Sequence, residues 1–223
     1  MRNNRTMGHV YTNVTLTINE KMKKYILCVI MLVMTVAATA QNTALAKKIL
    51  DKTAAIVGNK GGATANFKIA SAKMGGASGR ISIKGNKFYA TTGNATVWFN
   101  GKTQWSYLKS TNEVNVSTPT EAQRMRMNPY TFITMYKKGY ALGVTSKGAN
   151  YQVRMRAQNK QRSVQEIYLT INRKSYTPSV IKMREGGNWT TIYISNFQTK
   201  ALPNSLFSFN SKDYPKAEVI DLR

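Results

Sequence analysis

Cysteine and histidine are almost missing from this 223-residue sequence. The chain has one of each, Cys28 and His9, and both lie within the first 40 residues. The part after residue 40 therefore has no disulfide, no thiolate nucleophile and no imidazole base. These groups are the commonest zinc ligands and acid–base catalysts, and the remaining carboxylates form no glycosidase or metal-binding pattern. We therefore expect neither an enzyme nor a bound metal or cofactor.

Acidic residues are also scarce. The chain has 33 Lys and Arg against 9 Asp and Glu, and the part after residue 40 keeps a net charge of 28 − 8 = +20. Such a charge favours anionic partners, for example a membrane surface, an acidic protein or nucleic acid. The cations occur in runs of no more than two, which is typical of a generally basic surface and not of a nucleic-acid-binding arm. We expect no nucleic-acid partner; an anionic membrane surface and a merely solvated basic surface explain the charge equally well.

The sequence has one long apolar run, and it lies near the N-terminus. Lys23 and Lys24 precede the apolar residues 25–36, and Ala38-Thr39-Ala40 follow before Gln41. A basic segment, a short apolar stretch and a small-x-small site predict a secretory signal peptide. The run is shorter than the roughly 20 residues that a spanning helix needs, although a short membrane anchor is the alternative. We expect residues 1–21 to be an upstream extension, residues 22–40 the signal peptide and residues 41–223 the exported domain.

The exported part reads as one mainly β domain with a few helices. Apolar spacing predicts a helix over residues 43–57, and alternating residues between Gly- and Asn-rich turns predict short strands. The last of these are short closing strands at 206–209 and 217–222. About eleven strands and two or three helices predict a curved antiparallel sheet with helices against its concave side.

A short helix is predicted from Tyr130 to Lys138, and it is apolar almost all round. Pro129 suits its first turn and Gly139 its end. A helix at the surface normally has a clear polar face. We therefore expect this helix to be covered on more than one side, through Phe132, Ile133, Met135 and Tyr136.

The tripeptide Gly101-Lys102-Thr103 resembles the end of a phosphate-binding loop, but its surroundings exclude that function. The loop needs a glycine at position 96, which is Thr96 here, and a helix after it. Asn100-Gly101 instead predicts a two-residue type I′ hairpin, with Trp98 opposite Thr103 and Thr96 opposite Trp105. One face then carries Thr96, Trp98, Trp105 and Tyr107, and the other carries Val97, Phe99, Lys102 and Gln104. Two apolar faces indicate either a sheet covered on both sides or a lipophilic hollow on one.

The order of these motifs resembles the LolA-like periplasmic carriers of outer-membrane lipoproteins. The most specific matches are the strand Gly79-Arg80-Ile81-Ser82-Ile83-Lys84 and the hairpin Asn100-Gly101-Lys102-Thr103-Gln104-Trp105-Ser106-Tyr107. Asn128-Pro129-Tyr130 and Phe207-Ser208-Phe209 follow in the same order. The resemblance covers nearly all of residues 43–223.

The resemblance implies a strongly curved, incomplete β-barrel with an N-terminal helix, closed by a helical lid over an apolar hollow. It implies a soluble, monomeric periplasmic carrier that receives acylated lipoproteins from an inner-membrane transporter and passes them to an outer-membrane acceptor. The residues expected to line the hollow are Phe67, Ile69, Phe88, Trp98, Trp105 and Tyr107. The residues expected on the lid are Phe132, Ile133, Met135 and Tyr136, and the alternative for both sets is ordinary core packing.

One departure from the family pattern concerns the lid. Well-known members have Lys-Arg-Pro after the second strand, and their arginine is thought to latch the lid, whereas this chain has Lys84-Gly85-Asn86. Gly85 has no side chain to donate a hydrogen bond. Either Arg80 or another cation such as Lys84 serves as latch or docking group, or the lid is looser. Three alternatives to the lipoprotein carrier stay open: a carrier of another lipid or glycolipid, an enzyme acting on envelope lipid, and a polyanion-binding envelope protein.

Overall fold

The computed structural model describes residues 20–71, 75–120, 123, 129–137 and 139–223. The chain divides into two units, residues 1–39 and residues 40–223. Helix α1, Glu20–Val57, contributes to both units, and it ends at the residue that the apolar spacing predicted. Within the described residues, no helix has a segment both long and apolar enough to cross a membrane.

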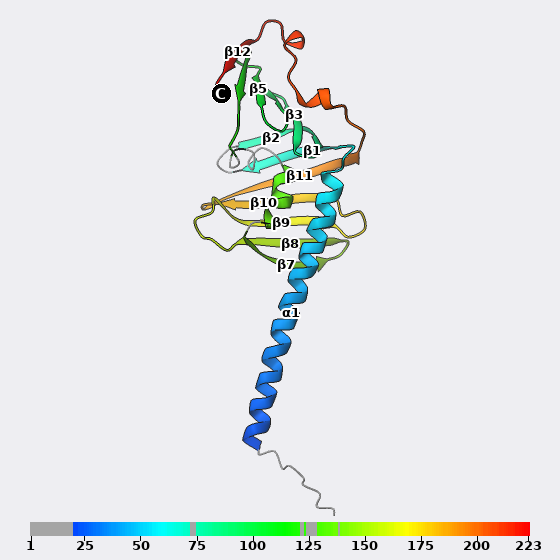
Figure 1. Cartoon of the computed structure of the whole chain (residues 1–223), viewed down its shortest axis with the longest axis vertical. Helices are drawn as coiled ribbons and strands as arrows, with labels where there is room; N and C mark the ends of the chain where they lie inside the picture. Colours follow the sequence, from blue (N-terminus) through cyan, green and yellow to red (C-terminus); the bar gives the residue numbers. More distant parts are fainter. Residues whose placement is uncertain (1–19, 72–74, 121–122, 124–128, 138) are drawn as a thin grey trace, which may run out of the picture. The chain divides into compact units, whose positions relative to one another are not determined.

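The described residues of 40–223 form one twelve-stranded sheet, close to the eleven or so strands that the sequence predicted (Figure 1). Every pairing is antiparallel except that of β12 with β6, which is parallel. The order across the sheet is β12-β6-β5-β4-β3-β2-β1-β11-β10-β9-β8-β7. The strands are β1 (Ala63–Ser71), β2 (Gly75–Lys84), β3 (Lys87–Thr92), β4 (Ala95–Phe99), β5 (Gln104–Leu108), β6 (Glu113–Ser117), β7 (Tyr140–Lys147), β8 (Asn150–Ala157), β9 (Val164–Asn172), β10 (Pro178–Glu185), β11 (Asn188–Thr199) and β12 (Glu218–Asp221).

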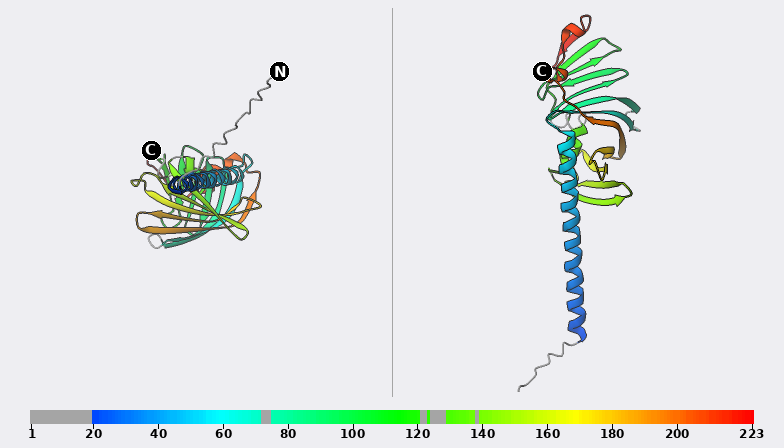
Figure 2. Two further views of the ribbon diagram at one scale, coloured as in Figure 1. Left: turned by 90° about the horizontal axis from the view of Figure 1, so that it is seen from below. Right: turned by 90° about the vertical axis from the view of Figure 1, so that its right-hand side faces the viewer.

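The core lies on the concave face of this sheet, which we call the inner face. Figure 2 shows the C-terminal part of α1 running along it. The helix contributes a buried stripe at helical spacing, and strands β8–β11 contribute every second residue. The buried residues include Ala46, Ile49, Leu50, Ala54 and Val57 from α1 and Val153, Met155, Ile167, Leu169, Ile171, Ile181 and Ile192 from the strands.

The short apolar helix also packs on the inner face. It comprises α3, Pro129–Thr134, and a 3-10 turn η1, Met135–Lys137. Phe132, Ile133, Met135 and Tyr136 are all buried and belong to the core. The prediction that this segment is covered on more than one side is confirmed.

The β4–β5 hairpin has a longer turn than predicted. Trp98 pairs with Trp105 and Phe99 with Gln104, so four residues, 100–103, form the connection. The Asn100 side chain accepts hydrogen bonds from the backbone N–H groups of Lys102 (3.0 Å) and Thr103 (2.9 Å), and this local turn replaces the type I′ turn. The predicted register was therefore wrong by two residues, which leaves the grouping of faces intact because side chains alternate with period two.

The C-terminal segment covers the opposite, outer face of the sheet. It begins at Lys200, whose N–H donates to the carbonyl of Gly62, and it ends in β12 beside β6. Two 3-10 turns lie along it, η2 (Asn204–Phe207) and η3 (Ser211–Asp213). The predicted strand at 206–209 is therefore wrong, because the chain turns at η2 and buries Phe207 there.

Candidate functional site

An apolar pocket opens between the inner face and the helices that cover it. It has a volume of about 30 Å³. Its lining includes Val57 of α1, Ile133 of α3 and Pro178 of β10. Strands β1, β2 and β11 contribute the rest, which apart from Asn66 is apolar: Ala65, Phe67, Ile81, Ile83, Ile192, Ile194 and Phe197. A cavity of that size holds about one water molecule. The pocket is therefore narrow in this structure, and Ile133 of α3 forms part of its wall.

Phe67 is the largest side chain that β1 contributes to this pocket. Its neighbours across the sheet are Ile194 of β11 and Gly79 of β2. A Cβ at Gly79 would lie 1.8 Å from the Thr91 carbonyl oxygen and 3.0 Å from Cζ of Phe67. The glycine of the Gly-x-Ile-x-Ile-Lys motif thus lets β3 and the Phe67 ring approach β2 closely.

The structure divides the six predicted lining residues between the two faces of the sheet. Phe67, Ile69 and Phe88 lie with the inner core, Phe88 fully buried and the other two partly. Phe88 of β3 pairs with Phe99 of β4, and Tyr89, the next residue of β3, pairs with Trp98. Trp98 therefore points to the face opposite that of Phe88. Trp105 and Tyr107 share the outer face with Trp98 through the β4–β5 pairing. The sequence placed those three rings together but could not show which face was concave.

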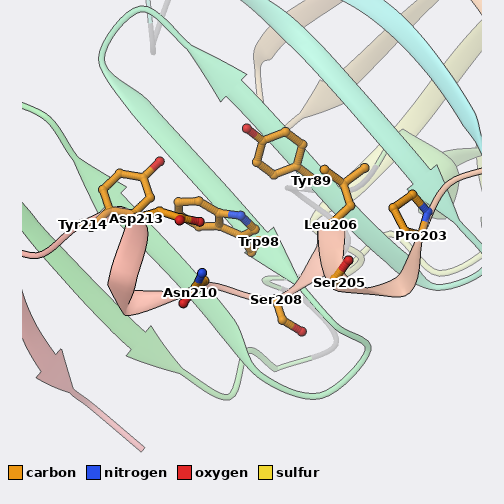
Figure 3. A pocket seen from close by; sticks show the side chains of 9 residues that line it. All are labelled: Tyr89, Trp98, Pro203, Ser205, Leu206, Ser208, Asn210, Asp213 and Tyr214. Atoms are coloured by element: carbon orange, nitrogen blue, oxygen red, sulfur yellow. The ribbon is translucent and has the colours of Figure 1, made fainter.

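The outer aromatic rings are covered by the C-terminal segment. Trp98 packs edge-on against Phe209 and Tyr214, with ring centroids 5.5 Å apart in each case. Tyr107 lies 4.6 Å from Tyr214. Figure 3 shows Trp98 and Tyr89 beside this segment, where they line an open pocket of about 550 Å³. The roles of Phe209 and Tyr214 were missed because their partners lie more than 100 residues earlier in the chain.

A polar contact joins the short helix to α1. The Tyr136 hydroxyl donates a hydrogen bond to Asp51 Oδ1, and Lys47 Nζ lies 3.6 Å from the other oxygen of Asp51. The hydrogen bond from Tyr136 lowers the pKa of Asp51 below its ordinary value near 3.8, with burial opposing and Lys47 assisting. Asp51 was not among the predicted site residues. Its carboxylate makes a side-chain hydrogen bond to the short helix, which Gly85 cannot make because it has no side chain.

Removing this contact is expected to loosen the short helix. A Tyr136→Phe variant keeps the buried ring but loses the hydrogen bond, which we expect to cost about 1 kcal/mol because the carboxylate is half exposed and solvent-screened. Local opening should then be about 5-fold more frequent, measured by hydrogen exchange of amides in residues 129–137. The matched control is Tyr140→Phe, whose hydroxyl donates to the carbonyl of Val164 instead; equal effects of both changes in residues 129–137 would contradict the role of Asp51.

The pH dependence of this contact follows from the lowered pKa of Asp51. The stabilisation is fully present above the ordinary value near 3.8 and is lost as the pH falls through the lower folded-state pKa. The difference between wild type and Tyr136→Phe should therefore shrink below about pH 4. An unchanged difference at about pH 2 would contradict the assignment.

The two cations proposed as latch groups lie on the outer face. Arg80 pairs across the sheet with Asn66 and Thr91, next to the inward-facing Ile81. Lys84 donates a 2.6 Å hydrogen bond to the carbonyl of Leu202 and so holds the start of the C-terminal segment. Gly85 has φ +59° in the β2–β3 turn, a conformation that suits glycine at the first position of a type II′ hairpin. The structure does not bring either cation to the short helix.

The described part of the chain holds no candidate metal centre. No group of three or more His, Cys, Asp or Glu residues is placed there to hold a metal ion. Gly101-Lys102-Thr103 lies in the β4–β5 connection between two strands, where no helix N-terminus meets it. The pocket on the inner face is instead suited to an apolar group.

Known proteins share the family and the fold of this chain. The sequence profile of the family described as outer membrane lipoprotein carrier protein LolA matches residues 36–187. An uncharacterized conserved protein from Thermus thermophilus shares the fold, with a TM-score of 0.54 at 15% identity over 79% of this chain and 98% of that one. A LolA superfamily protein from Nitrosomonas europaea gives a TM-score of 0.41 at 11% identity over 74% and 97% of the two chains. No curated protein sequence matches significantly. Because the profile spans more than half of the sequence, the chain belongs to the LolA family of outer membrane lipoprotein carrier proteins.

Proposed function

We propose that this protein is a soluble periplasmic carrier that holds the acyl chains of lipoproteins against its inner face. The observation that carries the proposal is the apolar pocket beneath a helix that is itself apolar on nearly every side. Each acyl CH₂ group removed from water contributes roughly 0.8 kcal/mol. An apolar surface with a movable cover therefore allows such chains to cross an aqueous space without any chemical step.

Binding requires α3 and η1 to move away from the sheet. The present volume of about 30 Å³ is too small for an acyl chain, since it is close to the share of one water molecule. Phe132, Ile133, Met135 and Tyr136 fill the space that an acyl chain would take, and Phe67, Ile69 and Phe88 would remain as its walls. Replacing one set of apolar contacts with another keeps the exchange nearly balanced, so the cargo can be released to an acceptor.

The proposal includes export and two partners. Residues 22–40 would act as the cleaved signal peptide, with residues 1–21 as an upstream extension and residues 41–223 as the working domain. An inner-membrane transporter would load the carrier and an outer-membrane acceptor would unload it, as the resemblance to the LolA-like carriers implies. The protein would work as a monomer and without a cofactor.

A transfer assay tests this function. The protein is purified from the exported fraction, where mass spectrometry should find Gln41 as the first residue. Inner membranes that release acylated lipoprotein are incubated with and without it, and lipoprotein should appear in the soluble fraction only when it is present. Absence of soluble lipoprotein, with a correctly processed and folded protein, would overturn the proposal.

A carrier of another lipid or glycolipid is the second candidate, and one observation favours it. Gly85 stands where well-known family members have the latch arginine, and Tyr136 and Asp51 make the contact between helices instead. A different closure is compatible with a different cargo. Mass spectrometry of material extracted from the purified protein separates the two, because lipid without any acylated polypeptide would favour this candidate.

A further inference from the structure

A grid of cations lies on the outer face of β8, β9 and β10. Arg156 pairs with Glu166, and Glu166 pairs with Arg184. Two residues further along each strand, Arg154 pairs with Tyr168, and Tyr168 pairs with Lys182. Side chains that are Cα partners point to the same face, and the alternating residues between them belong to the core. We call the cations on this surface, Arg154, Arg156, Lys160, Lys182 and Arg184, the outer basic face.

Glu166 holds two of these cations in place. Its Oε1 lies 2.6 Å from Arg154 Nη2 and its Oε2 lies 3.5 Å from Arg184 Nη2, and Tyr168 donates a 3.0 Å hydrogen bond to it. Burial alone would raise the pKa of Glu166, but the hydrogen bonds from Arg154 and Tyr168 and the charges of both arginines lower it. One carboxylate thus neutralises only part of the surrounding charge.

Three of these cations line a pocket at one edge of the outer basic face. The pocket has a volume of about 350 Å³, and its lining comprises Arg156, Ala157, Gln158, Lys160, Gln165 and Arg184. It contains no carboxylate. Arg156 and Lys160 are exposed, and neither has an ion-pair partner within the part of the chain described. Guanidinium, ammonium and amide N–H groups together suit a phosphate group.

Two aromatic rings on this face are already covered by cations. Lys182 Nζ lies 4.7 Å and the Arg184 guanidinium 5.9 Å from the Trp189 ring, and the Arg154 guanidinium lies 5.8 Å from the Tyr168 ring. Single-stranded nucleic acid needs open ring faces on which bases stack. A bilayer surface needs only positive charge and amphipathic rings at the headgroup level. The arrangement therefore favours a membrane over nucleic acid.

We propose that the outer basic face docks the protein on an anionic phospholipid bilayer, with a headgroup phosphate in the pocket beside Arg156 and Lys160. The surface is separate from the apolar pocket on the inner face. Docking places the carrier beside a membrane whatever cargo it holds. The proposal and the carrier function can therefore fail independently.

Sedimentation with lipid vesicles tests the docking. The exported protein is mixed with vesicles of phosphatidylglycerol and phosphatidylcholine, and with vesicles of phosphatidylcholine alone, in the absence of any lipoprotein. We expect binding only to the anionic vesicles. An Arg156→Gln/Lys160→Gln double variant should bind them about 30-fold more weakly, since each cation near an anionic surface contributes roughly a factor of five.

A control variant that loses the same charge elsewhere distinguishes binding by the outer basic face from general electrostatic attraction. Lys102→Gln/Lys109→Gln removes two exposed lysines at the β4–β5 and β5–β6 turns, and its vesicle affinity should stay within about 3-fold of wild type. Equal losses in both double variants would overturn the proposal. It would also be overturned if the first variant lost affinity for a thymidine oligonucleotide or inorganic phosphate but not for anionic vesicles.

Discussion

A Phe67→Glu variant is expected to bind a fluorescent fatty-acid probe at least about 100-fold more weakly than the wild-type protein, because a carboxylate facing an acyl chain must give up water without gaining a partner. Phe67 lies between Ile194 and Gly79 on the inner face, and the pocket lining beside it is apolar except for Asn66. The glutamate would therefore find no cation there. Fluorescence titration at neutral pH measures the loss.

The same strand supplies the control for this variant. Ala70 is exposed and lies on the outer face, three residues from Phe67, so Ala70→Glu adds the same charge to the same strand. Its probe affinity should equal that of wild type. Circular dichroism should show both variants folded, since Phe67 is only partly buried. Undiminished probe binding by a folded Phe67→Glu variant would contradict the assignment of the inner face.

Gly79→Ala is expected to destabilise the fold by about 3 kcal/mol, the upper end of the range for overpacking, because the added methyl group meets backbone that cannot turn aside. The Cβ would lie 1.8 Å from the Thr91 carbonyl oxygen, so β2 and β3 must separate locally. For a domain of this size the midpoint of thermal unfolding should fall by roughly 6–12 °C. Urea unfolding at neutral pH measures the free energy.

Gly76→Ala is the matched control, since it changes the same residue type in the same strand. A Cβ there would meet only the Ile69 carbonyl oxygen, at 3.6 Å, which is an ordinary contact. Its stability should remain within about 0.5 kcal/mol of wild type. Similar losses from both substitutions would show that strand propensity, and not the close approach of Thr91, explains the need for glycine at the start of the motif.

The sequence could predict features that depend on neighbours along the chain. The end of α1 at Val57, the buried short helix and the alternation of β8 and β9 all follow from apolar spacing. The hairpin register failed for a similarly local reason: the side chain of Asn100 accepts two backbone N–H groups and so favours a four-residue turn over the two-residue turn that Asn-Gly usually indicates.

The candidate site was only half predictable, because alternation assigns residues to a face without saying which face is concave. Phe88 and Trp98 are equally suited to line a hollow by residue type, yet they point to opposite sides of the sheet. The Tyr136–Asp51 contact spans 85 residues, and the rings of Trp98 and Tyr214 are still further apart in the chain. No local pattern identifies such pairs.

By itself, the sequence determined the class of this protein: a mainly β chain with a basic surface and, after residue 40, no cysteine or histidine, whose motifs resemble the LolA carriers. Composition and charge are sums over residues, and periodicity and motifs depend on residues close together in the chain. None of them requires knowing which strands pair. The tertiary structure alone decided that Phe67 and Phe88 face the helices while Trp98 lies under the C-terminal segment. The reason is physical: the curvature of the sheet and the path of residues 200–217 depend on contacts between distant segments. These contacts decide which apolar face the helices cover and which face the C-terminal segment covers.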